Sequence, residues 1–213
     1  MPIVDVQFRI TGKSIPVDHG YALFAGISSL IPELHDHHAV GIHPITGRLA
    51  GNRSLTITDR STLTVRLPAE LTAMVLPLAG KTLKIGESSL HVGVPYTRAL
   101  VPCARARSRL VVIKGFMEPE PFLEAAARQL RELGVNGKPH LTAQSRVAET
   151  NIGRTGGTHS HYLRRTIRIH DKEVVGFAVT VSELTAEGSV HLQEKGIGGR
   201  RRFGCGVFVP DRR

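Results

Sequence analysis

The chain has no tryptophan, aromatic residues make up only 5% of it, and its 213 residues include two cysteines. Cys103 and Cys205 lie far apart without a CxxC pair, which excludes a zinc knuckle or a disulfide framework and predicts two packing residues. No apolar run approaches the roughly 20 residues that cross a bilayer. The first ten residues lack the pattern of a signal peptide. We therefore expect a cytoplasmic protein without a membrane partner.

Positive charge is the strongest compositional signal. Lys and Arg number 28 against 18 Asp and Glu, which gives a formal net charge of +10. Such a field favours a polyanionic partner, because each phosphate that is neutralised releases condensed counterions. A basic protein tuned only for solubility is the alternative. Clustering of the arginines favours a phosphate track, in three groups: Arg105, Arg107, Arg109; Arg164, Arg165, Arg168; and Arg200, Arg201, Arg202.

Hydrophobic periodicity predicts the same element order twice. In the first half we expect strands at 2–10, 39–45, 62–68 and 81–96. A first helix, capped by Asp18 and ending at Pro32, is expected after the first strand, and a second helix at 68–80. In the second half we expect a strand at 108–115, a helix at 118–134, a strand at 140–148, a hairpin at 164–184, a helix at 185–196 capped by Thr185, and a strand at 205–210.

Two consecutive β-α-β-β-α-β units predict an α+β protein with two tandem ferredoxin-like folds, at residues 1–100 and 107–213. The RNA-recognition motif has this topology, but VVIKGF lacks the aromatic residues on which such sheets stack bases. An RNA partner would therefore be held by arginines, loops and backbone.

The segment from Gly196 to Gly206 contains five glycines and three arginines. Glycine lets the backbone approach a ligand closely, so that successive N–H groups can line a phosphate. A flexible turn is the alternative, whereas the pattern fits neither GxGxxG nor a P-loop. We predict RNA contact at Gly198, Gly199, Arg200, Arg201, Arg202, Gly204 and Gly206.

The segment GIGGRRRFGCGVF resembles the glycine-rich loop of the repeat-associated mysterious protein (RAMP) superfamily of CRISPR proteins. LIPELHDHHAVGIHPITGR and KEVVGFAVTVSEL are similar to segments of its precursor-CRISPR-RNA-processing endoribonucleases, in their short myxobacterial-type subfamily. The resemblance implies a protein of antiviral defence that cleaves CRISPR repeats without a metal or other cofactor. The implied products are a 5′-hydroxyl and a 2′,3′-cyclic phosphate. The implied partners are precursor CRISPR RNA and other subunits of the surveillance complex.

The residues agree with such chemistry, because the sequence shows no obvious carboxylate cluster for two-metal hydrolysis and has eleven histidines suited to proton transfer. In the resembled family a catalytic histidine follows the first helix, commonly with a tyrosine on that helix. By this resemblance His35, fourteen residues after Tyr21, is the first candidate and His43 the second. HDHH could instead be an exposed turn or a metal-binding tract. Arg48 or Arg53 could stabilise the scissile phosphate.

Some alternatives stay open at this point. His159 and His161 are further candidates for RNA contact, in a loop that could equally be disordered. For the whole chain, the rival to an enzyme is a non-catalytic RNA-binding subunit of a CRISPR complex. It would keep the folds, the glycine-rich loop and the arginines but would need no histidines. A general or ribosome-associated RNA-binding protein is a more distant third hypothesis.

Overall fold

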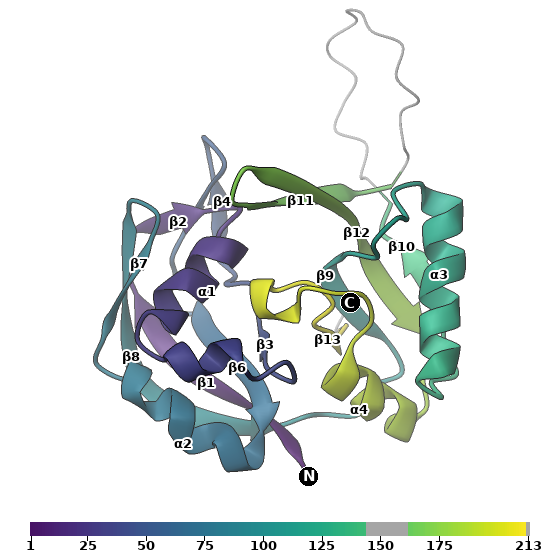
Figure 1. Cartoon of the computed structure of the whole chain (residues 1–213), viewed down its shortest axis with the longest axis horizontal. Helices are drawn as coiled ribbons and strands as arrows, with labels where there is room; N and C mark the ends of the chain where they lie inside the picture. Colours follow the sequence, from purple (N-terminus) through teal and green to yellow (C-terminus); the bar gives the residue numbers. More distant parts are fainter. Residues whose placement is uncertain (144–161, 212–213) are drawn as a thin grey trace, which may run out of the picture.

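A computed structural model describes residues 1–143 and 162–211. Most strands of the first half form one antiparallel sheet, which we call the first sheet (Figure 1). Its order is β3 (Gly41–Ile42), β6 (Thr62–Pro68), β1 (Ile3–Thr11), β8 (Ser88–Ala99) and β7 (Thr82–Ile85). The first strand lies between the third and fourth of the repeat, as in a ferredoxin-like fold.

The second sheet repeats this arrangement. Its order is β10 (Lys138–Leu141), β12 (Lys172–Ser182), β9 (Ala106–Val111) and β13 (Val209–Pro210), with β11 (Arg164–Ile169) also paired to β12. Strands β10 and β11 pair with different parts of β12, because β10 faces 179–182 and β11 faces 172–177. The predicted tandem ferredoxin-like fold is confirmed by the matching order of both sheets and by the superpositions described below. The domain limits at 100 and 107 stay a prediction.

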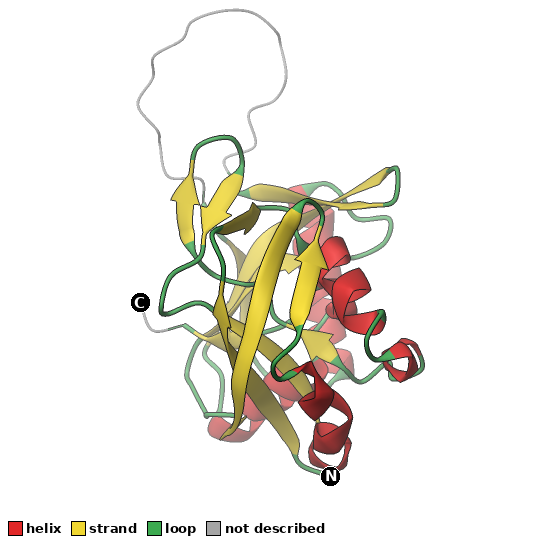
Figure 2. Ribbon diagram, turned by 90° about the vertical axis from the view of Figure 1, so that its left-hand side faces the viewer, coloured by secondary structure: helices red, strands yellow, loops and turns green. Residues whose placement is uncertain are grey.

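The helices gather on one side of the sheets (Figure 2). Helix α3 (Pro119–Glu132) buries Phe122, Ala126 and Leu130 on one face, as its spacing predicts. Helix α4 (Ala186–Lys195) has the predicted cap, with the Thr185 hydroxyl accepting a hydrogen bond from the Gly188 amide. The predicted helix at 68–80 is broken into η2 (Ala69–Leu71), α2 (Thr72–Val75) and η3 (Leu76–Leu78). None of the helices in the described ranges is long and apolar enough to span a bilayer.

The prediction of Asp18 as a helix cap was wrong. Helix α1 (Gly20–Ser28) begins after His19, which makes no side-chain capping bond. The Asp18 carboxylate instead accepts a hydrogen bond from the backbone amide of Arg168 on β11, at 2.8 Å. A contact between residues 150 positions apart therefore replaces the expected local one. The sequence pattern cannot distinguish these two roles, because an aspartate can accept a hydrogen bond either from the first turn of a helix or from a distant backbone amide.

Two further differences concern short elements. The predicted last strand at 205–210 is reduced to Val209–Pro210, because Gly204 and Gly206 have φ of +82° and +65° and interrupt the extended chain. A small third sheet was not predicted. It has the order β2 (Ser14–Pro16), β5 (Ser54–Thr56) and β4 (Arg48–Ala50).

The hydrophobic core has two main parts, one for each large sheet. A smaller cluster of Leu110, Val112, Ile167 and Cys205 lies beside the second part. Phe203, from the glycine-rich segment, packs against both this cluster and the first core. The C-terminal segment is thereby fixed against the N-terminal half of the chain, where it reaches α1 (Figure 1).

Candidate active site

The glycine-rich segment meets helix α1 through aromatic rings. Its short helix η4 (Arg201–Phe203) places the Phe203 ring 5.7 Å from the ring of Tyr21 and 5.3 Å from that of Phe24, measured between centroids. Both contacts are edge-on, the arrangement that the ring quadrupoles favour. Tyr21 and Phe24 are three residues apart and so share one helix face. Arg202 of the C-terminal loop lies against this same face, over the Phe24 ring.

His35 lies at the end of the same aromatic row. It closes the short helix η1 (Pro32–His35), and its exposed ring stands edge-on to Phe24 with 5.0 Å between centroids. The Arg202 guanidinium lies 5.3 Å from the Phe24 ring and donates a hydrogen bond of 2.5 Å to the His35 carbonyl. The structure therefore brings three residues from the sequence prediction, His35, Tyr21 and Arg202, into one neighbourhood.

His43 has different surroundings. Its side chain is only 13% exposed, and its Nε2 lies 3.3 Å from Oδ1 of Asp5 without the geometry of a hydrogen bond. Burial lowers the pKa of His43, and the nearby Arg66 and Arg201 act in the same direction while Asp5 opposes them. The ring therefore stays neutral beside an ionised carboxylate.

Arg66 joins Asp5 to the second half of the chain. Its guanidinium is 1% exposed and donates to both carboxylate oxygens of Asp5, at 2.7 and 2.9 Å. It also donates to the carbonyls of Gln193 in α4 and Phe208 before β13, at 2.9 and 2.6 Å. Burial alone would raise the pKa of Asp5, but His43, once it is protonated at low pH, and the Arg66 guanidinium hold it far below its usual range. This buried pair is a structural link between the halves.

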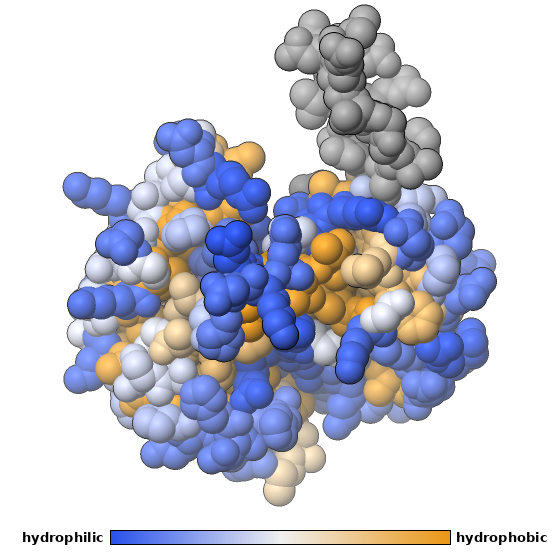
Figure 3. All heavy atoms as spheres, turned by 45° about the horizontal axis from the view of Figure 1, so that its top comes forward, coloured by the Kyte–Doolittle hydropathy of each residue, from blue (hydrophilic) through white to orange (hydrophobic). Residues whose placement is uncertain are grey.

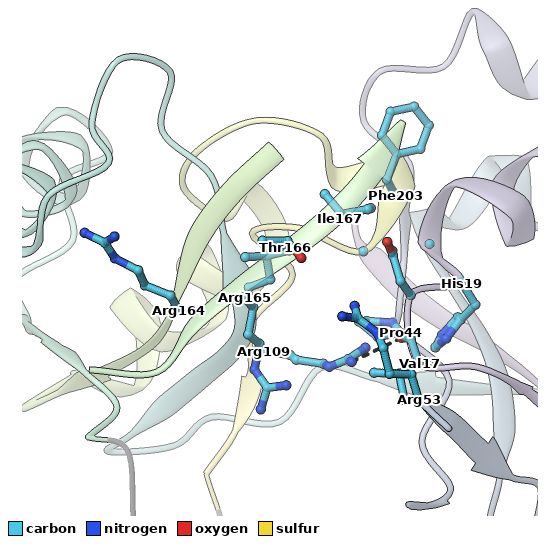
Figure 4. Close-up of a pocket in the computed structure, with 14 residues that line it drawn as sticks. Val17, His19, Pro44, Arg53, Arg109, Arg164, Arg165, Thr166, Ile167 and Phe203 are labelled. Atoms are coloured by element: carbon cyan, nitrogen blue, oxygen red, sulfur yellow. Dashed lines mark hydrogen bonds between the residues drawn. The ribbon is translucent and has the colours of Figure 1, made fainter. Parts of the chain in front are cut away.

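A cleft of about 260 Å³ lies between the loop that follows β2 and strands β9 and β11. Figure 4 shows Arg109 and Arg165 beside one another in it, whereas Arg164 points away. Burial lowers the pKa of Arg109, and the charge of Arg165 adds to this effect. The Nε of Arg165 has no hydrogen-bond partner. Arg53 lines the same cleft from the loop between β4 and β5. Arg109 and Arg165 are half-buried, and such incompletely paired guanidinium groups are suited to binding an anion such as phosphate.

The other predicted RNA-binding arginines are dispersed. Arg164 donates to Glu118 and lies over the Phe177 ring, while Arg48, Arg168 and Arg200 are exposed. Arg201 points inward, and burial with the nearby Arg66 lowers its pKa to about 10. Figure 3 shows hydrophilic side chains gathered between the two halves. The arginines therefore form three groups: Arg53, Arg109 and Arg165 line the cleft, Arg201 and Arg202 lie in the glycine-rich loop, and Arg48, Arg164, Arg168 and Arg200 are exposed.

The glycines of the C-terminal segment have a structural role that the sequence interpretation did not include. A Cβ on Gly206 would collide with the Ile197 carbonyl, so this position requires glycine. The amides of the four predicted glycines donate within the protein: Gly198 to the Gln129 side chain, Gly199 to Val112, Gly204 to Arg201 and Gly206 to Leu110. Their contact with RNA stays a prediction, but these amides are not free to line a phosphate.

His19 lines the cleft as a buried, neutral imidazole, which the sequence interpretation missed. Its Nδ1 lies 2.9 Å from the Pro16 carbonyl, and its Nε2 accepts from the Ile45 amide at 2.9 Å. A ring that donates through one nitrogen and accepts through the other must be neutral. Burial lowers the pKa of His19, although the hydrogen bond to Pro16 opposes the shift. His19 thus fixes the cleft wall rather than exchanging protons.

We expect the free energy of unfolding to fall as the pH decreases below about 6.5, the ordinary pKa of histidine. His19 and His43 have lowered pKa values in the folded chain, so the unfolded chain binds more protons in this range and stability rises with pH. Each can contribute a slope of up to about 1.4 kcal/mol per pH unit. Urea unfolding at pH 7.5 and 5.5 measures this change. Equal midpoints at both pH values would contradict the expectation.

The sequence also led to predictions for the two cysteines, for a metal-binding histidine tract, and for His159 and His161. Cys103 and Cys205 are free, and burial raises the pKa of Cys205 to about 12, which fits their predicted role in packing. No group of three or more potential ligand side chains within 1–143 and 162–211 is placed to hold a metal ion, and this covers the histidine-rich segment. His159 and His161 lie outside the described residues.

The sequence interpretation missed several residues of this region. Phe24 and Phe203 were not singled out as site residues. His170 falls within the predicted hairpin at 164–184, yet its Nε2 lies 2.8 Å from the Tyr21 hydroxyl. Asp5 on β1 and Arg66 on β6 lie opposite one another on paired strands. In the sequence, only opposite charges on two strands expected to pair could have indicated this contact.

The comparisons with known proteins agree with this geometry. The family model described as Cas6 Crispr matches residues 4–213. A CRISPR-associated endonuclease Cas6 from Myxococcus xanthus strain DK1622 is 37% identical over 210 residues, which are 99% of this chain and 82% of that protein. The family match and the 37% identical relative define this chain as a CRISPR-associated protein. The chain belongs to the Cas6 family, as its resemblance to RAMP processing proteins implied.

Solved structures support the fold. A Cas6-related protein from Pyrococcus furiosus superposes with a TM-score of 0.66 at 13% identity, covering 99% of this chain and 100% of that one. A RAMP protein that binds different RNA substrates superposes with a TM-score of 0.64 at 12% identity, covering 98% and 99%. At these identities the likeness concerns the fold alone.

Proposed function

We propose that the chain is a metal-independent endoribonuclease that cuts precursor CRISPR RNA within its repeats. The observation that carries the proposal is the meeting of His35, Tyr21 and Arg202 on one surface, although Arg202 lies 167 residues from His35. Membership of the Cas6 family supports the substrate, because the relative in Myxococcus xanthus is a CRISPR-associated endonuclease. Other subunits of the surveillance complex are further proposed partners.

The proposed reaction is an internal transesterification. The ribose 2′ oxygen forms a bond to the adjacent phosphorus while the bond from phosphorus to the 5′ oxygen breaks. A base takes the 2′-hydroxyl proton, and an acid gives a proton to the leaving 5′ oxygen. The products are a 2′,3′-cyclic phosphate and a 5′-hydroxyl.

We assign proton transfer to His35, because its ring is exposed and the Arg202 guanidinium binds its backbone carbonyl. Tyr21 is proposed to assist His35 in catalysis, and Arg202 is proposed to supply positive charge near the reacting phosphate. The buried, neutral His43 next to Asp5 is the weaker candidate, since RNA reaches an exposed ring more easily.

The RNA backbone is proposed to cross the cleft that Arg53, Arg109 and Arg165 line. Guanidinium groups with unused donors give charge-assisted hydrogen bonds to phosphate oxygens. The exposed Arg48, Arg168 and Arg200, with Arg164, are proposed to extend this track on either side.

A labelled repeat RNA tests the proposal. Cleavage is expected to persist in excess EDTA, because protein side chains move the protons. A repeat with 2′-deoxyribose at the cut is expected to stay intact, because it lacks the attacking oxygen. The products are checked for the cyclic phosphate. Loss of activity in EDTA that magnesium restores would contradict the metal-independent mechanism, and cleavage of the deoxy repeat would exclude internal attack.

A further inference from the structure

The turn between β11 and β12 holds a histidine in an unusual backbone conformation. The strands pair up to Ile169 and Lys172, so that His170 and Asp171 form a two-residue loop. His170 has φ of +52°, in the left-handed region that glycine occupies most easily in such loops. Histidine therefore occupies position 170 at a conformational cost relative to glycine, a cost that the contacts of its ring can offset.

The His170 ring contacts Tyr21 of helix α1. Its Nε2 lies 2.8 Å from the Tyr21 hydroxyl, and the two ring centroids are 4.8 Å apart with the planes tilted by 53°. The Phe203 ring also contacts Tyr21, edge-on and with 5.7 Å between the ring centroids. The phenol is therefore held by one residue from the β11–β12 turn and one from the glycine-rich segment, both far from it in sequence.

A second anchor strengthens the same junction. The Arg168 backbone amide, two residues before His170, donates to the Asp18 carboxylate, three residues before Tyr21. The hairpin is thus fixed to the start of α1 at two points, one of which uses only backbone on the hairpin side. Removal of the His170 ring would leave this second contact in place.

We infer that His170 is a positioning residue for Tyr21 in the cleavage reaction. In this inference the imidazole Nε2–H donates to the phenol oxygen of Tyr21, which leaves the phenol's own proton free to point toward the reacting phosphate. This inference rests on the proposed function of the site. His170 acts through Tyr21 and needs no contact with RNA.

Two variants separate the ring from the turn. His170→Gly removes the imidazole and suits the left-handed backbone, so the hairpin is retained. His170→Gln keeps a hydrogen-bonding nitrogen near the position of Nε2 but cannot exchange a proton at neutral pH. Asp171→Ala, in the same loop, is the matched control. All are compared with Tyr21→Phe and with the double variant His170→Gly/Tyr21→Phe, using steady-state cleavage of a repeat RNA, which gives kcat and KM.

We expect His170→Gly to lower kcat about tenfold with KM unchanged, in line with the loss of one hydrogen bond. His170→Gln should remain close to wild type, and His170→Gly should have no further effect in the Tyr21→Phe background. Several results would overturn the inference: an unchanged kcat, an effect on KM alone, effects that add to Tyr21→Phe, or a Gln variant as slow as Gly. Wild-type protein that does not cleave would refute the proposed function, and the inference with it.

Discussion

His35→Ala is expected to lower the rate of repeat cleavage by about a hundredfold to ten-thousandfold, the usual worth of general acid–base catalysis. The imidazole is the group proposed to move a proton. Affinity for the RNA should change by less than about tenfold, or 1.4 kcal/mol, because the cleft arginines carry most of the binding. Cleavage is measured under single turnover and affinity with a 2′-deoxy repeat.

The same histidine-rich segment supplies the controls. His38→Ala removes an exposed neighbouring imidazole and should leave the rate unchanged. His43→Ala tests the weaker candidate, and its folding must be verified because the ring lies against Asp5. Full activity of His35→Ala would move the active site elsewhere. Wild-type protein that binds the repeat tightly and never cuts it would favour the non-catalytic subunit.

Arg66→Met is expected to lower the free energy of unfolding by about 3 to 5 kcal/mol, because it leaves the Asp5 carboxylate buried without its partner. The variant also removes donors from the carbonyls of Gln193 and Phe208, which link the second half of the chain to β6. Urea unfolding at pH 7.5 measures the loss.

Arg98→Met is a matched control. Arg98 faces Asp5 from the opposite neighbouring strand but is exposed, so its loss should change stability by less than about 0.5 kcal/mol. Combining Arg66→Met with Asp5→Asn should cost less than the sum of the two single changes, since it removes both charges of the pair. An Arg66→Met midpoint equal to that of the control would show that the buried pair does not stabilise the fold.

Periodicity predicted the elements that depend on local sequence. Strand β6 and helix α3 were found because their apolar residues recur with the period of a strand and of a helix, respectively. The Thr185 cap was predicted because capping joins groups three residues apart. The small third sheet was missed, since its strands have three residues each and too few positions for a period.

Residue types also indicated part of the candidate site. His35 and Tyr21 follow from the resemblance, and Arg202 from the glycine-arginine pattern, and the structure brings these three residues close together. The sequence interpretation assigned the loop's amides to phosphate, whereas they bind Gln129, Val112, Arg201 and Leu110 within the protein. Several acceptors lie dozens of residues away, so local reasoning could not identify them.

The sequence by itself determined the class of protein: its alternating and helical periods define two similar α+β units, and its net charge of +10 indicates a polyanionic partner. The tertiary structure alone decided which titratable groups face solvent. His35 is exposed, His43 lies against Asp5, and His19 is neutral in the cleft wall. These histidines are chemically identical in the sequence. Their environments differ because desolvation and neighbouring charges depend on elements that meet only after the two halves pack together.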